Sequence, residues 1–183
     1  MEIASIANGY QVLNIATSGN GTRVLDASPV GTRFLILMQG GAAELREVQS
    51  RVQEMFDGIE ALMRVDMELL VEVDARVTEA VFALAQVPLH ESLVVVETSS
   101  VSGCLQAAQT LVNGHGLVPI EIRIQRSSSG GAYGFFTGSQ ASCAPAVADV
   151  RTKLSAELRQ GRVELIERPT KEFRSFFQIS GDF

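Results

Sequence analysis

The residue types that most often carry enzymatic chemistry are sparse in this chain of 183 residues. It has 2 histidines, His90 and His115, and 2 cysteines, Cys104 and Cys143. Their spacing is not typical of a metal site, a disulfide framework or a nucleophile beside a base. We expect both histidines in solvent-exposed loops and both cysteines in the core. The sequence therefore predicts no catalytic residue, no metal site, no cofactor and no enzymatic activity.

Two short segments rich in small polar residues could present hydroxyl and peptide groups to a ligand. They are Ser28-Pro29-Val30-Gly31-Thr32 and Arg126-Ser127-Ser128-Ser129-Gly130. The second lacks the Gly-Lys-Ser/Thr ending of a phosphate-binding P-loop. Without further information it is interpreted as a turn between two strands.

Charge and hydropathy argue against two kinds of partner. The formal net charge is −6 and the Lys and Arg residues are scattered, so no nucleic-acid-binding surface is predicted. The apolar runs are far shorter than the roughly 18 to 20 residues of a membrane helix. No signal peptide is recognised at the start, which favours a cytoplasmic location. With 46% hydrophobic residues the chain can bury a core.

The two halves of the chain resemble each other when residue n is aligned with residue n+95. Five positions are then identical within 21, which is more than composition alone produces, and we interpret this as a diverged duplication. The identical pairs are Glu2 and Glu97, Ser5 and Ser100, Gln11 and Gln106, Gly19 and Gly114, and Gly21 and Gly116.

Hydrophobic periodicity predicts the same order of elements in each half. In the second half we expect strands over 93–96, 118–125, 133–137 and 163–166, helices over 101–112 and 143–154, and a short tail helix. In the first half we expect helices over 6–18 and along Leu45, Val48, Val52 and Met55, and strands over 23–27, 34–38 and 67–74. The predicted fold class is α+β, with two ferredoxin-like β-α-β-β-α-β domains in tandem, 1–88 and 91–183, the second including a C-terminal tail.

The leading strand of the first repeat is truncated in this reading, because the chain begins at Met1-Glu2 where the second repeat has a full strand before Glu97. A missing strand would expose backbone groups that must be paired or covered. Either most of the strand is absent or another segment supplies it, and 177–183 is one candidate.

Several segments, in their order along the chain, resemble a bacterial microcompartment shell domain. In the second half they are Glu97-Thr98-Ser99, Ala107-Ala108, the loop before Gly131, Phe136-Thr137-Gly138 and Ile166-Glu167-Arg168-Pro169. In the first half, 2–9 and 33–38 resemble the leading domain of the tandem-domain shell proteins. The resemblance covers nearly the whole chain.

This resemblance implies a homotrimer whose six domains form a pseudohexameric tile in a cytoplasmic microcompartment shell. Its partners would be other shell proteins, enclosed enzymes and small polar metabolites that pass a central pore. The pore-lining residues would be Ser28, Pro29, Val30, Gly31, Thr32, Arg126, Ser127, Ser128, Ser129 and Gly130. Some relatives hold an iron–sulfur cluster through a cysteine in the first of these loops, which has no thiol here, so no cluster is expected.

The resemblance also implies residues for tile-to-tile contact. The family's edge lysine falls at Ser18 and Asn113, neither of which is lysine, while Arg168 keeps the arginine of the Arg-Pro ending. In the pore, Arg126 would favour the passage of anions if it faces the threefold axis.

The alternative from another class is a small-molecule-binding regulatory protein, because ferredoxin-like duplications also serve as ligand sensors and fold alone does not fix function.

Overall fold

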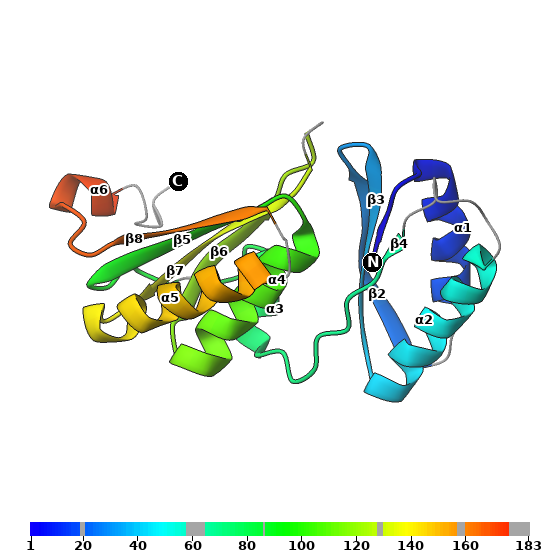
Figure 1. Ribbon diagram of the computed structural model, residues 1–183, viewed down its shortest axis with the longest axis horizontal. Coiled ribbons are helices and arrows are strands. Elements are labelled where there is room, and N and C mark those ends of the chain that lie inside the picture. Colours follow the sequence, from blue (N-terminus) through cyan, green and yellow to red (C-terminus); the bar gives the residue numbers. More distant parts are fainter. Residues whose placement is uncertain (19–20, 58–64, 86, 128–129, 157–159, 176–183) are drawn as a thin grey trace. The chain divides into compact units, whose positions relative to one another are not determined.

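The computed structural model of the chain describes residues 1–18, 21–57, 65–85, 87–127, 130–156 and 160–175. These residues form two compact units. The first unit comprises 1–71 and 125–130, and the second comprises 72–124 and 131–183. Each unit has one four-stranded sheet with helices on it (Figure 1).

In the first unit the elements are β1 (Glu2–Ile3), α1 (Ile6–Thr17), β2 (Thr22–Val30), β3 (Arg33–Gly40), α2 (Ala42–Phe56) and β4 (Val65–Asp66). The second unit contains α3 (Ala75–Val81), β5 (Ser92–Thr98), α4 (Val101–Gln109), the π-helical turn η1 (Thr110–Gly114), β6 (Val118–Ile124), β7 (Ala132–Gly138), α5 (Gln140–Ala156), β8 (Gly161–Ile166) and α6 (Lys171–Ser175). The mixed α+β class predicted from the sequence is confirmed.

Both sheets have the same topology. Their strand orders are β2-β3-β1-β4 and β6-β7-β5-β8, and every paired strand runs antiparallel to its neighbour. The sheet of each unit therefore places its first strand between its third and fourth, as a split β-α-β arrangement does.

Positions related by the offset of 95 also have the same local geometry. Ser5 and Ser100 are the N-cap residues of α1 and α4, and each accepts a hydrogen bond from the backbone N–H three residues later. Gly21 and Gly116 both have positive φ, +84° and +68°, at the entry to β2 and β6.

The edge strands share an irregularity as well. The register of β2 against β3 shifts between Val24 and Asp26, and that of β6 against β7 shifts between Pro119 and Glu121. The two shifts are 95 residues apart, so the same bulge occurs at the same place in each sheet.

The short leading strand β1 limits the length of the strand β4 that pairs with it. Strand β1 has 2 residues, and β4 pairs with it only through Glu2–Asp66 and Ile3–Val65. In the second sheet, β5 has 7 residues and pairs with β8 along 6 of them. A strand persists only where a partner can accept its backbone hydrogen bonds, so a two-residue β1 supports only a two-residue β4.

One prediction for this region is therefore corrected, and one helix was missed. The strand expected over 67–74 is wrong, because only Val65–Asp66 is extended and paired. The helix α3, which begins after the N-cap Asp74, was not predicted. Residues 177–183, considered as a donor of the leading strand, lie outside the described residues, and Glu2–Ile3 occupy its position in the sheet.

The compact units do not follow the predicted domain limits. Residues 72–88, assigned to the first domain by the sequence, lie in the second unit, and 125–130 lie in the first. The compact units are defined by which segments lie close together, whereas the predicted domains are defined by the duplication. The domain limits 1–88 and 91–183 therefore stay a prediction about the repeat.

Helix α1 packs closely on β3 in the core of the first unit. A Cβ at Gly9 would lie 2.2 Å from Cβ of Phe34, a side chain that is fully buried. In the second unit Cys104 is 95 residues after Gly9, and Ala132 pairs with Thr98 as Phe34 pairs with Ile3; both are buried. The small residue is thus on the helix in one unit and on the strand in the other.

Candidate functional site

The two segments with predicted pore-lining residues lie together in the first unit. The Arg126 guanidinium donates through Nη2 to Oδ2 of Asp26 at 2.6 Å and through Nη1 to the hydroxyl of Ser28. The Asp26 side chain is 17% exposed and that of Arg126 is 50% exposed. The 125–130 segment is thereby fastened to the outer strand of the first sheet.

The ion pair changes the electrostatics expected from the sequence. An arginine on a free loop would attract anions, but here the Asp26 carboxylate balances the Arg126 charge at contact distance. Besides this ion pair, the polar groups of the surface are the hydroxyl of Ser28 and the peptide groups of the turn.

Backbone conformation shapes both segments. Ser28, Pro29 and Val30 end strand β2, and Gly31, with φ +61°, and Thr32 turn the chain into β3. Val30 is buried, so only its backbone is available for a lining role.

The second segment ends at Gly130, and another glycine, Gly131, follows it directly. Gly130 donates its N–H to the Ser127 carbonyl at 3.0 Å. Gly131 has φ +88°, and a Cβ there would lie 2.4 Å from the carbonyl oxygen of Thr98, so only glycine fits. Ser128 and Ser129 lie outside the described residues.

The three predicted tile-edge residues have different surroundings. The Ser18 hydroxyl accepts from Nη2 of Arg51 at 2.8 Å at the end of α1. Asn113, on η1, donates through Nδ2 to the carbonyl oxygen of Glu72 at 2.8 Å. Arg168 is exposed, two residues after the end of β8.

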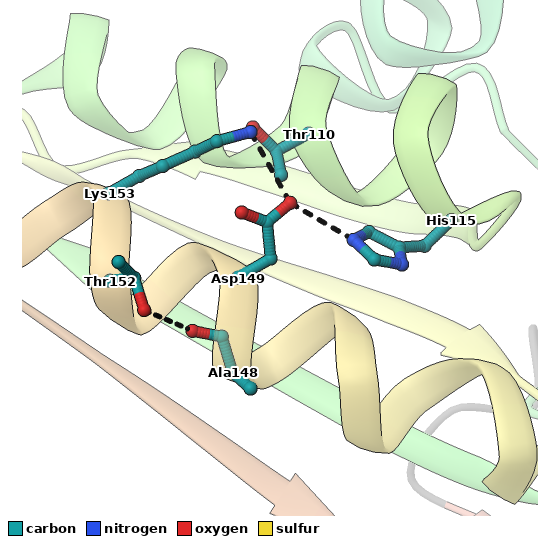
Figure 2. Close-up of polar contacts among 6 residues, drawn as sticks. All are labelled: Thr110, His115, Ala148, Asp149, Thr152 and Lys153. Carbon is teal, nitrogen blue, oxygen red and sulfur yellow. Dashed lines mark hydrogen bonds and ion pairs between the residues drawn. The ribbon is translucent and has the colours of Figure 1, made fainter.

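Sequence reasoning missed a polar cluster between η1 and α5, shown in Figure 2. Nε2 of His115 lies 3.1 Å from Oδ2 of Asp149, and Nζ of Lys153 donates to the same oxygen at 3.3 Å and to the hydroxyl of Thr110 at 3.3 Å. The expectation that His115 is solvent-exposed is wrong, because its side chain is 21% exposed.

This cluster holds a carboxylate between two basic groups. The hydrogen bond with His115 is the main cause that lowers the pKa of Asp149; desolvation opposes it, and the hydrogen bond from Lys153 lowers the pKa further. These contacts join η1 and its C-cap residue to α5 (Figure 2).

Arg174 was also not singled out by the sequence. Its guanidinium donates to the carbonyl oxygens of Leu89, His90, Glu91 and Pro169. Several carbonyls around one planar cation make a specific anchor. Helix α6 is therefore fixed to the segment that leads into β5.

Two general properties bear on function. No group of three or more His, Cys, Asp or Glu side chains within the described ranges could hold a metal ion. Of the helices in these ranges, none is long and apolar enough to cross a membrane.

Comparison with known proteins bears on the fold. No family model matches the chain. A solved microcompartment protein from Desulfitobacterium hafniense DCB is similar to it with a TM-score of 0.81 and 23% identity, covering 95% of both chains. A candidate transcriptional repressor of the glycine cleavage system has a TM-score of 0.34 and 12% identity over 91% of this chain and 95% of its own, and contributes nothing to the interpretation.

Proposed function

We propose, on the premise that this chain has the fold of a microcompartment protein, that it is a structural component of a bacterial microcompartment shell and not an enzyme. The observation that carries this proposal is the match at a TM-score of 0.81 over 95% of both chains. A similarity of that extent includes both units and leaves no further domain of the relative unmatched.

The proposed assembly is a homotrimer that forms a pseudohexameric tile. The support is the internal equivalence of the two units in strand order, helix caps and bulge, which we interpret as tandem ferredoxin-like domains. Six similar units from three chains can close a ring in the way that six identical domains would. Its partners would be other shell proteins and the enzymes that the shell encloses in the cytoplasm.

The proposed passage lies on the threefold axis and is lined by Ser28 to Thr32 and Arg126 to Gly130. The hydroxyl and peptide groups of these segments could replace part of the hydration of a small polar metabolite. Because Asp26 balances Arg126, the passage gains little preference for anions from that arginine.

Light scattering after size-exclusion chromatography, together with electron microscopy, tests the proposal. We expect a trimer that forms flat sheets or joins shells assembled with other shell proteins. A monomer or dimer whose melting temperature rises with a metabolite would instead support the regulatory alternative and overturn the shell assignment.

Selectivity of the passage is tested with Asp26→Asn, which removes the partner charge and keeps the side-chain size. In trimers inserted into a planar bilayer, we expect the reversal potential in a chloride gradient to shift toward anion selectivity. Asp26→Asn combined with Arg126→Gln should reverse the shift, and an unchanged potential in the single variant would contradict the lining role of Arg126.

A further inference from the structure

Helices α3 and α6 occupy equivalent positions in the two repeats. Each follows the fourth strand of its sheet, and their first residues, Ala75 and Lys171, are 96 positions apart. The same offset relates Val65 to Gly161, which pair with the equivalent residues Ile3 and Thr98.

The caps of the two helices correspond as well. The Asp74 carboxylate accepts from the backbone N–H of Arg76, and the Thr170 hydroxyl accepts from the backbone N–H of Phe173 at 3.1 Å. Asp74 and Thr170 are also 96 positions apart. Each repeat thus ends in a capped helix at the same point of its sequence.

Helix α3 trails the first repeat but packs in the second unit. It lies against β6 and α4, where Val77 and Ala80 are buried. The segment before it is held by Asn113, whose side chain donates to the Glu72 carbonyl. The trailing helix of one repeat therefore covers the first helix and second strand of the next.

On the first unit, apolar side chains at the equivalent place are exposed among the described residues. On α1, Ile6 is 39% exposed and Tyr10 is 58% exposed. Their counterparts on α4 are Val101, which is fully buried, and Leu105, which is half-buried.

The strand beside that helix shows the same difference. Val24 and Ala27 of β2 are only partly buried, whereas their counterparts Pro119 and Ile122 of β6 are buried. The first unit thus presents an apolar surface, formed by Ile6, Tyr10, Val24 and Ala27, at the place where the second unit carries α3.

We propose that α6 of one copy of this chain packs on this surface of the next copy, as α3 packs on β6 and α4. The proposal rests on the trimeric tile proposed above and names the contact that joins its copies. No residue of α6 is buried within its own chain, and Arg174 anchors the helix to the second unit. The contact is heterologous, since a helix of one copy meets a different surface of another, and such contacts form a ring when the rotation between copies closes, as the proposed trimer requires.

The same equivalence assigns a second contact. Asn113 and Glu72, which are hydrogen-bonded within the chain, correspond to Ser18 and Arg168. Ser18 of one copy should therefore lie beside the backbone of Arg168 of the next. Two residues considered for contacts between tiles would then contribute to the contact between copies within a tile.

Cross-linking between two single variants tests this pairing. Ser18→Cys and Arg168→Cys proteins are mixed, reassembled by dilution from low urea and treated with a short bismaleimide. Because each protein carries one of the two sites, a covalent dimer arises only between copies. We expect the mixed sample to give at least tenfold more dimer than either protein alone or than Ser18→Cys mixed with Ser155→Cys.

Asn113→Cys combined with Glu72→Cys in one chain is the positive control, because these residues are in contact within the second unit. The native thiols of Cys104 and Cys143 are buried and do not compete. A mixed sample that cross-links no more than the Ser155 control, in a protein that is a trimer by light scattering, would overturn the α6 contact and leave the trimer intact.

Ile6→Asp provides an independent measurement. An acidic residue in the first turn of α1 suits the helix dipole, so the unit itself should fold normally. We expect the trimer to dissociate at a concentration at least tenfold higher than for wild type, with unchanged far-UV circular dichroism, whereas Leu84→Asp, at a side chain 69% exposed, should have no effect. A trimer as tight as wild type would contradict the proposal, and a wild-type protein that is not a trimer would instead refute the proposed function.

Discussion

The exchange of small residues between helix and strand in the two cores makes a quantitative prediction. In the first unit Gly9 faces Phe34, and in the second the equivalent residues are Cys104 and Ala132. If the two units pack in the same way at this contact, Gly9→Cys combined with Phe34→Ala gives the first core the residue pair of the second.

The single substitutions should both be costly. Gly9→Cys forces its Cβ to within 2.2 Å of Cβ and Cγ of Phe34, and overpacking of a core costs about 3 kcal/mol at the upper end of the usual range. Phe34→Ala removes a fully buried ring, which costs about 4 kcal/mol. Independent effects would sum to about 7 kcal/mol, enough to unfold many domains. In the double variant the contact with Cγ and the ring is gone, but alanine keeps the Cβ that lies 2.2 Å away, so α1 must still move slightly from β3. The thiol then fills part of the cavity, and we expect a loss of about 5 kcal/mol and a coupling of about 2 kcal/mol.

Urea denaturation followed by far-UV circular dichroism measures these values, at one protein concentration so that any oligomer contributes equally. The conservative pair Val12→Ala with and without Phe56→Leu, elsewhere in the same core, serves as a control for general weakening. A double variant as unstable as the sum of the two single variants would refute the inference that the two cores share one packing arrangement.

Three further predictions concern local features of the fold. Ala83 has φ +54° after α3, so Ala83→Gly should raise the stability by about 1 kcal/mol in thermal unfolding, and no gain would argue against that backbone conformation. The Arg76 side chain lowers the pKa of Asp74 to about 2 from 3.8. A lowered carboxyl pKa stabilises the fold above the unfolded value and is lost as the pH falls from about 4 to about 2, so Asp74→Asn should lose less melting temperature than wild type in that window. Burial raises the pKa of Cys104 to about 12, so its thiol should resist iodoacetamide at pH 8 until the protein is unfolded, and rapid native labelling would be inconsistent with its burial.

The sequence predicted most of the fold because the signals involved are local. Ser5 and Ser100 cap helices, and the glycines at 21 and 116 take positive φ, through interactions within a few residues. The alternation over 67–74 resembles that of a strand, but a strand also depends on the length of its neighbour, which was only the two residues of β1. Asp74 followed by Val77 and Ala80 was a usable helix signal.

The contacts of the candidate site could not be predicted in the same way. Arg126 and Asp26 are 100 positions apart, and nothing in the composition of either segment specifies that they pair. The partner carbonyls of Arg174 include three about 85 positions earlier in the chain. Backbone carbonyls are present at every residue, so their selection by one guanidinium depends on tertiary structure alone.

The proposed heterologous contact also predicts how the trimer comes apart. A closed ring of three copies has three seams, whereas an open dimer has one seam for two copies, so the ring has more contact per copy than the dimer. Dilution should therefore convert trimer to monomer with little dimer between them, and Ile6→Asp should move this transition without creating a stable dimer. Light scattering across a dilution series measures the species directly. A persistent dimer would instead indicate a self-complementary contact between like surfaces, which the packing of α3 on β6 and α4 does not provide.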